Sequence, residues 1–352
     1  MFKPPRCPNS ACPNSRAPGP KFFTRQGTYK PKCRSKPVPR FRCKTCRKWF
    51  SRQTFRMDYR DHRPSLNAPL FKYVTSGVGI RQTSRNLNLT LRCTELKFHK
   101  IARHLRRLHL NLTGPLPKES QLVFDELETY ETRRNTRPLS VPILIEREQR
   151  FIIWAESAPI RPRGKMSKHR KRAVELENAF LGPRKDISRR SVKRTLKRGA
   201  DLVAHHHEVV FLSDEKSTYP GLAKEAFGPD RLVHLKTNSK VARVTFNSLF
   251  PINHEEAIMR DLLGRLRRDS WLVSKKRRYL DLGLQMHIAF RNYVKKRFNR
   301  DRESPAQRLG LVKRRLSFGE ALSWRQDWGK YSIHPLSKKG TAACSGGLRR
   351  AA

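Results

Sequence analysis

The sequence predicts an α/β protein in which a mixed sheet with flanking helices follows a small cysteine-rich module and a helical segment. Three observations support this prediction. Four of the seven cysteines form two closely spaced pairs near the N-terminus. Strand-like and helix-like segments alternate through the middle of the chain. The 352 residues include 78 Lys and Arg against 29 Asp and Glu, which gives a formal net charge of +49.

The excess of positive charge predicts a polyanionic partner. Each DNA phosphate that basic side chains neutralise releases a condensed counterion, so a chain of this charge is attracted to nucleic acid. Ribosomal and packaging proteins are similarly basic, but they are usually shorter and poorer in apolar strands. No stretch approaches 18 apolar residues, and the N-terminus lacks the apolar core of a signal peptide. We therefore expect a soluble intracellular protein whose partner is a polyphosphate such as nucleic acid.

The cysteine pairs predict a zinc site in a module of residues 1–60. Cys7 and Cys12 have the spacing C-x₄-C, and Cys43 and Cys46 have the spacing C-x₂-C. Two such pairs suit a tetrahedral thiolate site in which each pair comes from one tight turn. Nearby Arg and Lys side chains offset the negative charge of four thiolates. Cys33 is an alternative ligand in place of Cys7 or Cys12.

The next segment, residues 61–113, predicts two helices joined by a short turn. A helix that includes Ile80 and Ser84 is interrupted around Asn88, and Thr90 can cap a second helix. This pattern is typical of a helix-turn-helix, whose second helix enters the major groove of DNA. The base-reading candidates near the start of that helix are Arg92, Glu95, Lys97 and His99. A helical hairpin that only packs on its neighbours would have the same pattern.

Residues 118–300 predict the mixed sheet. Three strands at 121–131, 138–146 and 149–157 have short links, which favours antiparallel pairing. Later strands near 209–212 and 231–237 are separated by helices, which favours parallel pairing. The expected helices cover residues 173–204, 219–227, 252–268 and 279–298. Residues 301–352 are expected to form a basic tail that is partly disordered.

Two aspartates follow apolar strands in this domain. Asp125 follows Leu-Val-Phe, and Asp214 follows Val-Val-Phe-Leu-Ser. A carboxylate at the end of a strand often caps a turn, but two on neighbouring strands can share divalent ions. Mg²⁺ needs few protein oxygens, and a pair of such ions can activate an attacking hydroxyl group and stabilise a leaving oxygen. The aspartates therefore predict a magnesium or manganese site.

The order and spacing of these pieces resemble the small bacterial insertion-sequence transposases of the DDE type. The resemblance covers roughly residues 5–295 and includes FDELETYE, FLSDEKSTYP and NHEEAIMRDLLGRLRRDSWLVSKK. It implies a zinc ribbon, a helix-turn-helix and a ribonuclease-H-like catalytic domain. It also implies magnesium-dependent cleavage of transposon ends and joining to target DNA, with Asp125 and Asp214 as the two family aspartates. The partners would be terminal inverted repeats and target DNA, bound by a homo-oligomer in the bacterial nucleoid.

The third family acid is not where the resemblance places it. Alignment of the late helix puts Asn253 at the expected glutamate, and an amide oxygen can bind magnesium without supplying charge. Glu256 lies about one helical turn further on the same side, so we expect it to be the third ligand. Glu255 is the alternative, although it falls on the stripe that faces the sheet. His254 would orient a ligand or a water.

Basic residues after this helix are expected to hold DNA phosphates near the acids. The candidates are Arg260, Arg265, Arg267, Arg268, Lys275 and Lys276, with Trp271 available to pack or to stack on a base. By contrast, the run from His205 to His207 adjoins a strand, so alternate residues face opposite sides and a structural role is expected.

The asparagine at position 253 leaves a second function open. A protein that kept the cysteine site and the helix-turn-helix but lost catalysis would be a DNA-binding remnant of a transposase. The retained Asp125 and Asp214 favour the enzyme. A structural RNA-binding protein would explain the charge but not the paired aspartates.

Overall fold

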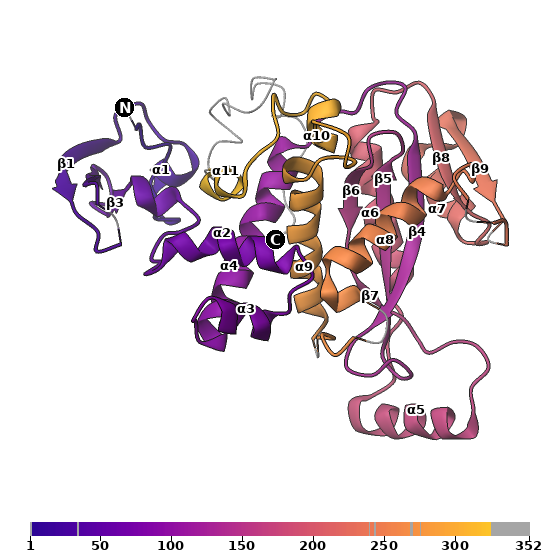
Figure 1. Ribbon diagram of the computed structural model, residues 1–352. Helices are drawn as coiled ribbons and strands as arrows, with labels where there is room; N and C mark the ends of the chain where they lie inside the picture. Colours follow the sequence, from indigo (N-terminus) through magenta and orange to yellow (C-terminus); the bar gives the residue numbers. More distant parts are fainter. Residues whose placement is uncertain are drawn as a thin grey trace.

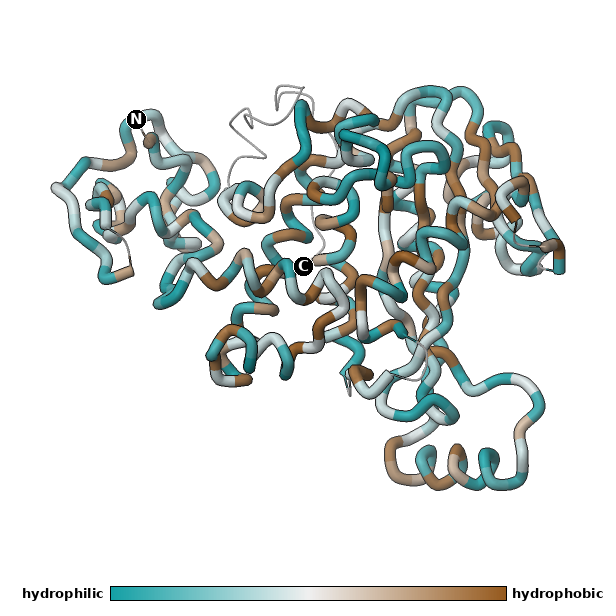
Figure 2. The backbone as a smooth tube through the Cα atoms, in the orientation of Figure 1, coloured by the Kyte–Doolittle hydropathy of each residue, from teal (hydrophilic) through white to brown (hydrophobic). Residues whose placement is uncertain are grey.

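A computed structural model of the chain describes residues 2–33, 35–238, 240–242, 244–267, 270–274 and 276–324. A small β module lies at one end of the molecule, a group of helices follows it, and the sheet domain lies at the other end (Figure 1). The hydropathy colouring shows apolar stretches along the strands of the sheet and along the helices that cover it (Figure 2). Among the described residues, no helix is long and apolar enough to cross a membrane.

The N-terminal module is a three-stranded antiparallel sheet built from β1 (Phe23–Tyr29), β2 (Val38–Cys43) and β3 (Trp49–Ser51). The short helix α1 (Pro13–Arg16) precedes it. Alternation along β2 turns Phe41 and Cys43 inward, where they join buried phenylalanines in a small core separate from the rest of the protein. Few other apolar side chains are available, so this module depends on its cysteines for stability.

The two helices joined by a short turn that the sequence predicts within residues 61–113 are confirmed. Helix α2 (Asn67–Val74) leads to α3 (Ile80–Asn86) and α4 (Leu91–Leu112). In the turn, Asn88 has φ of 48°, a left-handed conformation that asparagine tolerates well. Thr90 caps α4 by accepting a hydrogen bond from the backbone N–H of Cys93 at 3.2 Å.

The apolar buried face of α4 begins after its first two turns. Leu91 and Leu96 are 39% and 54% exposed, whereas Phe98, Ile101 and Leu105 are buried. The C-terminal part of α4 packs on the sheet domain, so α4 and the sheet share one hydrophobic core.

The sheet has the strand order β6-β5-β4-β8-β9, with β7 (Ala158–Pro159) paired to β5. Strands β4 (Leu122–Tyr130), β5 (Pro138–Glu146) and β6 (Phe151–Ala155) pair antiparallel. Strands β8 (Val209–Asp214) and β9 (Leu232–Thr237) add in parallel beside β4. The mixed sheet predicted from the lengths of the connections is therefore confirmed.

Helices cover both faces of this sheet (Figure 1). One face packs on α4, α6 (Ser188–Leu202) and α7 (Tyr219–Phe227), and the other packs on α8 (Phe250–Leu262) and α9 (Arg277–Ala289). Covering on both sides explains why β5 is apolar without alternation and buried over nearly its whole length.

Three helical predictions need corrected boundaries. The single helix expected over 173–204 is two helices, α5 (Lys168–Leu181) and α6, because Gly182-Pro183 breaks it. The helix expected to reach residue 268 ends at Leu262 and continues as the 3-10 turn η4 (Gly264–Leu266). The last one, α9, changes to the π-helical turn η5 (Phe290–Val294).

Part of the expected basic tail is folded. Helices α10 (Pro305–Arg308) and α11 (Phe318–Ser323) contribute Ala306 and Leu322 to the core around α4, and the segment between them contributes Val312. The remaining residues of the expected tail, 325–352, lie outside the described part of the chain.

Two buried histidines make the stability of this fold depend on pH. Burial lowers the pKa values of His104 and His109 to about 4. His109 Nε2 lies 2.9 Å from the carbonyl oxygen of Ile153, and its Nδ1 lies 3.1 Å from the Tyr293 hydroxyl. Between pH 6.5 and pH 4 the unfolded chain binds more protons than the folded chain, so these histidines lower stability as the pH falls.

The free energy of unfolding should fall in both proteins when the pH is lowered from 7.5 to 5.0. We expect the fall to be about 2 kcal/mol smaller in His109→Gln than in the wild type. Urea unfolding at the two pH values measures this difference. The exposed His207 supplies the control, because His207→Gln should keep the wild-type pH dependence. Equal losses in wild type and His109→Gln would show that His109 is not buried in its neutral form.

Candidate metal centre and active-site cleft

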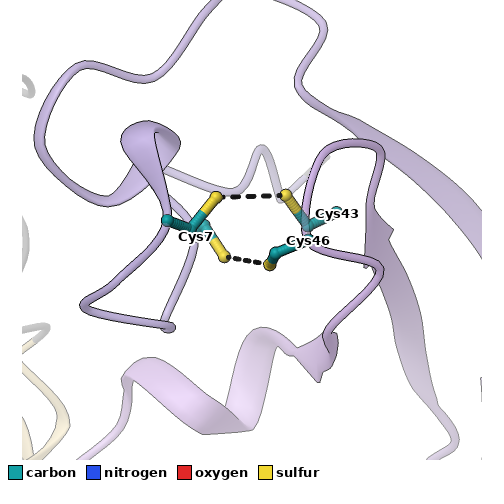
Figure 3. Close-up of side chains that lie close together, drawn as sticks. Cys7, Cys43 and Cys46 are labelled. Atoms are coloured by element: carbon teal, nitrogen blue, oxygen red, sulfur yellow. Dashed lines mark hydrogen bonds between the residues drawn. The ribbon is translucent and has the colours of Figure 1, made fainter.

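The four predicted cysteines come together in the N-terminal module (Figure 3). The sulfur atoms of Cys7, Cys12, Cys43 and Cys46 all lie within 4.8 Å of one another. The Cys7 and Cys46 sulfurs are 3.5 Å apart, and those of Cys12 and Cys43 are 3.8 Å apart. A tetrahedral zinc with Zn–S bonds of about 2.3 Å has S–S edges of about 3.8 Å. The group therefore has the size and ligand chemistry to hold a zinc ion, and Cys33 is not part of it.

The surroundings shift the pKa values of the Cys7 and Cys46 thiols in opposite directions. Burial raises the pKa of Cys7, while the backbone N–H of Lys48 lowers the pKa of Cys46. A buried thiol with a raised pKa becomes a thiolate only when a cation compensates its charge, which a bound metal does. Phe50 is buried in the same core as the cysteines, whereas Trp49 is 47% exposed, with the guanidinium of Arg40 5.0 Å from its ring centroid.

The two aspartates occupy equivalent positions on neighbouring parallel strands. Leu122 of β4 pairs with Phe211 of β8, and Val123 pairs with Leu212. Asp125 and Asp214 each lie three residues after the members of the first pair, so the same register places them side by side. Since both are two residues beyond the Val123–Leu212 pair, whose side chains face α8 and α9, both belong to that face of the sheet.

A cleft of about 750 Å³ is lined by all four residues predicted as ligands of the catalytic metal ions. Asp125, Asp214, Asn253 and Glu256 all line it. Asn253 and Glu256 are three residues apart on α8, so they share one side of the helix, as predicted. The Asp214 carboxylate accepts a 3.2 Å hydrogen bond from the backbone N–H of Lys216, and Glu256 lies 3.2 Å from Arg260. Among the described residues, only the cysteines form a group of potential metal ligands within 4.8 Å.

Glu255, the alternative third ligand, is buried on the other side of α8 and does not line the cleft. Its carboxylate accepts hydrogen bonds from Arg291 Nε at 2.8 and 3.1 Å, and both side chains are fully buried. Burial raises the pKa of Glu255, but His287 and Arg291 outweigh this effect and keep it below its usual value. The pair fixes α8 against the π-helical turn η5, so Glu255 has a structural role.

We expect Arg291→Met to lower the free energy of unfolding by about 3–5 kcal/mol, because it leaves the buried Glu255 carboxylate without its counterion. Denaturant unfolding measures this loss. The double variant Glu255→Gln/Arg291→Met removes both charges and should recover much of it. A double variant that is as unstable as the sum of both single variants would show that the two groups do not act as a pair.

Sequence reasoning missed a polar network beside Asp125. Glu126 also lines the cleft, and it accepts hydrogen bonds from Ser140, Lys216 and the Tyr219 hydroxyl, the last at 2.7 Å. Burial raises the pKa of Glu126, but these donors outweigh it and hold the pKa below its usual value. The network joins β4 and β5 to the turn after β8, and so holds the two aspartate-bearing strands together. Its sequence signal was an acid directly after Asp125 and a lysine two residues after Asp214.

Basic side chains surround the acids. The predicted Arg260 and Arg267 both line the cleft. Arg265 instead donates to Thr129 at 3.2 Å and to the Tyr130 carbonyl group, and desolvation lowers its pKa to about 10. Four more arginines come from the β4–β5 connection and the basic segment before and within α5: Arg134, Arg161, Arg163 and Arg170. The predicted Arg268 and Lys275 lie outside the described residues.

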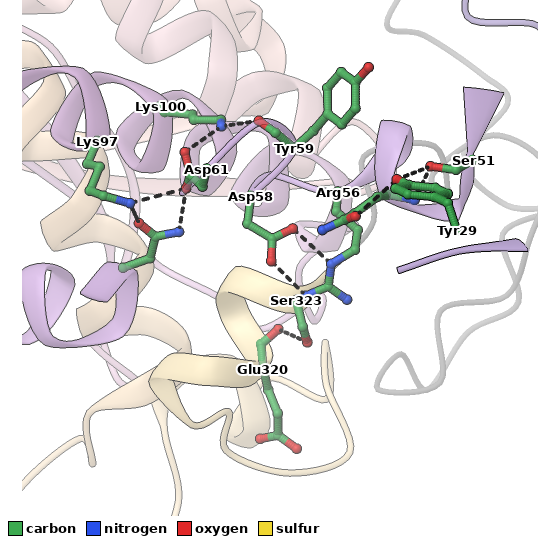
Figure 4. Close-up of polar contacts among 12 residues, drawn as sticks. Tyr29, Ser51, Arg56, Asp58, Tyr59, Asp61, Lys97, Lys100, Glu320 and Ser323 are labelled. Atoms are coloured by element: carbon green, nitrogen blue, oxygen red, sulfur yellow. Dashed lines mark hydrogen bonds and ion pairs between the residues drawn. The ribbon is translucent and has the colours of Figure 1, made fainter. Parts of the chain in front are cut away.

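The helix-turn-helix candidates separate into two groups. Arg92 is exposed at the start of α4. Lys97 is 5% exposed, and its ammonium group donates to Asn67 Oδ1 at 2.9 Å and lies 3.4 Å from Asp61 (Figure 4). Lys97 thus ties α4 to the segment before α2 and is not on a surface that DNA can reach. A charged residue buried by its partners cannot be recognised from the helical pattern alone.

The histidines predicted near the site have packing roles. His206 is buried with Nε2 3.2 Å from the Leu116 carbonyl oxygen, and no histidine of the described residues joins a metal-ligand group. His254 stacks on Phe250 with ring centroids 5.7 Å apart and does not line the cleft. Trp271 is fully exposed.

Comparison with known proteins does not assign this chain to a family. No protein-family model matches it, and no curated protein matches it.

Proposed function

We propose that this protein is a DDE-type transposase, which cuts the ends of an insertion sequence and joins them to target DNA by metal-dependent phosphoryl transfer. One observation carries the proposal: Asp125, Asp214 and Glu256 line one cleft whose other walls are rich in arginine. These three carboxylates share the cleft with Glu126 and Glu128, and acids gathered at one place repel one another as packing but are useful as cation ligands.

The residues of the cleft suit this chemistry. Asp125, Asp214 and Glu256 supply carboxylate oxygens and Asn253 supplies an amide oxygen, which are the ligands that magnesium or manganese prefers. When bound, two such ions supply Lewis-acid activation of the attacking and leaving oxygens. Arg163 and Arg260 are placed to hold phosphate oxygens at the rim of the same cleft.

The rest of the fold supports the proposal. The resemblance implies a ribonuclease-H-like domain, and such a domain needs a mixed sheet with two aspartates on adjacent central strands. The sheet of this protein has that arrangement. The cysteine group is suited to a zinc ribbon, and α3 and α4 to a helix-turn-helix that holds terminal inverted repeats. Cutting and joining two ends requires both ends at once, so we expect a homo-oligomer on DNA.

The test is to incubate the zinc-loaded protein and magnesium with a labelled duplex that ends in the element's own terminal repeat. We expect nicked and joined products on a sequencing gel. Tight binding of the repeat with no cutting in magnesium or manganese would instead identify a catalytically inactive DNA-binding remnant, as the asparagine at position 253 allows.

A further inference from the structure

A second cleft lies at the β6 edge of the sheet, away from the four residues predicted to bind the catalytic metal ions. It has a volume of about 760 Å³ and is formed by α4, α6 and α9 around Trp154. None of Asp125, Asp214, Asn253 or Glu256 lines it. Its cationic side chains come from all three helices: Arg103, Arg106, Arg194, Lys197, Arg198, Arg277 and Arg278.

Helical spacing explains how the cations gather. Arg103 and Arg106 are three residues apart on α4, as are Arg194 and Lys197 on α6, and each pair therefore lies on one face of its helix. The opposite face of α6 is apolar or small and packs on the sheet through Val192, Thr195, Leu196 and Gly199. The basic faces of separate helices are therefore turned toward the same space.

The cleft holds more cations than its acids can neutralise. Of its three carboxylates, Glu156 lies 2.6 Å from Arg194 and Asp281 lies 3.6 Å from Arg277. Within the described parts of the chain, the other five cations form no ion pair with a carboxylate: Arg103, Arg106, Lys197, Arg198 and Arg278.

Two of these cations lie against the same aromatic ring. The guanidinium groups of Arg106 and Arg198 lie 5.2 and 5.1 Å from the ring centroid of Trp154. Desolvation first, and the charge of Arg198 next, lower the pKa of Arg106. Like charges arranged in this way repel each other, and a bound anion removes the repulsion.

We propose that this second cleft binds the sugar-phosphate backbone of duplex DNA, independently of its sequence. The inference rests on the proposed function for its choice of DNA. Cations from three helices require a ligand with several negative charges along its length, and guanidinium groups match phosphate oxygens in geometry. Trp154 is 2% exposed, so no base can stack on it. The DNA bound here would be flanking or target DNA held while another segment occupies the active-site cleft.

The test is a charge-neutral variant of the second cleft: Arg103→Gln, Arg106→Gln, Lys197→Gln and Arg198→Gln together. Affinity for a duplex of random sequence is measured by fluorescence anisotropy at several salt concentrations. We expect the slope of log affinity against log salt concentration to become less steep by about 2–4. Each phosphate contact contributes about −0.9 to this slope, and the variant removes up to four contacts. Replacing the three arginines by lysine instead keeps the charge and should keep the slope.

The matched control removes four exposed cations elsewhere, through Arg300→Gln, Arg302→Gln, Lys313→Gln and Arg315→Gln. It has the same net charge as the second-cleft variant, so a general charge effect would change both slopes equally. Equal slopes in the two variants would overturn the proposal. Circular dichroism establishes that both variants are folded before their slopes are compared.

Cleavage by the same proteins separates this proposal from the proposed function. We expect the second-cleft variant to retain magnesium-dependent cutting at saturating DNA. If the wild type shows the steep slope but never cuts, the transposase proposal fails and the second cleft stands. If the wild type cuts and the variant binds like the control, the second cleft fails and the transposase stands.

Discussion

Asp125→Asn and Asp214→Asn are each expected to lower the rate of magnesium-dependent DNA cutting about a thousandfold or more. Each substitution removes a charged ligand from the cleft, and a thousandfold corresponds to about 4 kcal/mol of transition-state stabilisation. Asparagine has nearly the same shape. Its amide oxygen can still accept the hydrogen bond that Asp125 receives from the Glu126 N–H at 2.7 Å, so the fold should persist. Single-turnover cutting of a labelled terminal repeat measures the effect.

The matched control for this prediction is Asp230→Asn, which makes the same chemical change in the exposed turn after α7. It should cut at the wild-type rate. Glu256→Gln should also lose cutting, since Glu256 lines the cleft. If both aspartate variants cut as fast as Asp230→Asn, neither carboxylate takes part in the reaction.

Cys43→Ser is expected to release zinc and unfold the N-terminal module while the sheet domain remains folded. Cys43 is fully buried in a core of cysteines and phenylalanines that is separate from the other two cores. Structural zinc sites contribute apparent binding free energies of about 10–16 kcal/mol, far more than this core can replace. Zinc content by mass spectrometry and limited proteolysis of the first 60 residues measure the result.

Cys33→Ser is the control, because Cys33 lies outside the cysteine group. It should retain one zinc ion per chain and resist proteolysis like the wild type. Retention of zinc by Cys43→Ser, or loss of zinc from Cys33→Ser, would show that a different ligand set holds the metal.

Local sequence patterns predicted the positions of the strands, the cysteine group and the cleft residues Asp125, Asp214, Asn253 and Glu256. Asp125 and Asp214 were identifiable because each follows a run of apolar strand residues and parallel pairing aligns strand ends. Helical spacing on α8 also separated Glu256 from Glu255, since only one face of that helix can lie on the sheet. These predictions depend on periodicity within single elements or on the pairing of neighbours.

Features that depend on distant partners could not be predicted. The burial of Lys97 requires Asp61 and Asn67, which belong to a segment some thirty residues earlier. The second cleft joins Arg106, Arg198 and Arg278 from three helices far apart in the chain, so no local pattern reveals it. The folding of residues 301–324 likewise depends on the core that α4 offers them.

The most direct test of the active-site cleft is to count the manganese ions bound by the zinc-loaded protein on duplex DNA, by electron paramagnetic resonance. We expect the wild type and Asp230→Asn to bind manganese tightly, and Asp125→Asn and Asp214→Asn to lose that binding. Because the measurement does not depend on cutting, it tests the ligands themselves. The same number of tightly bound ions in all four proteins would contradict a metal site at these aspartates.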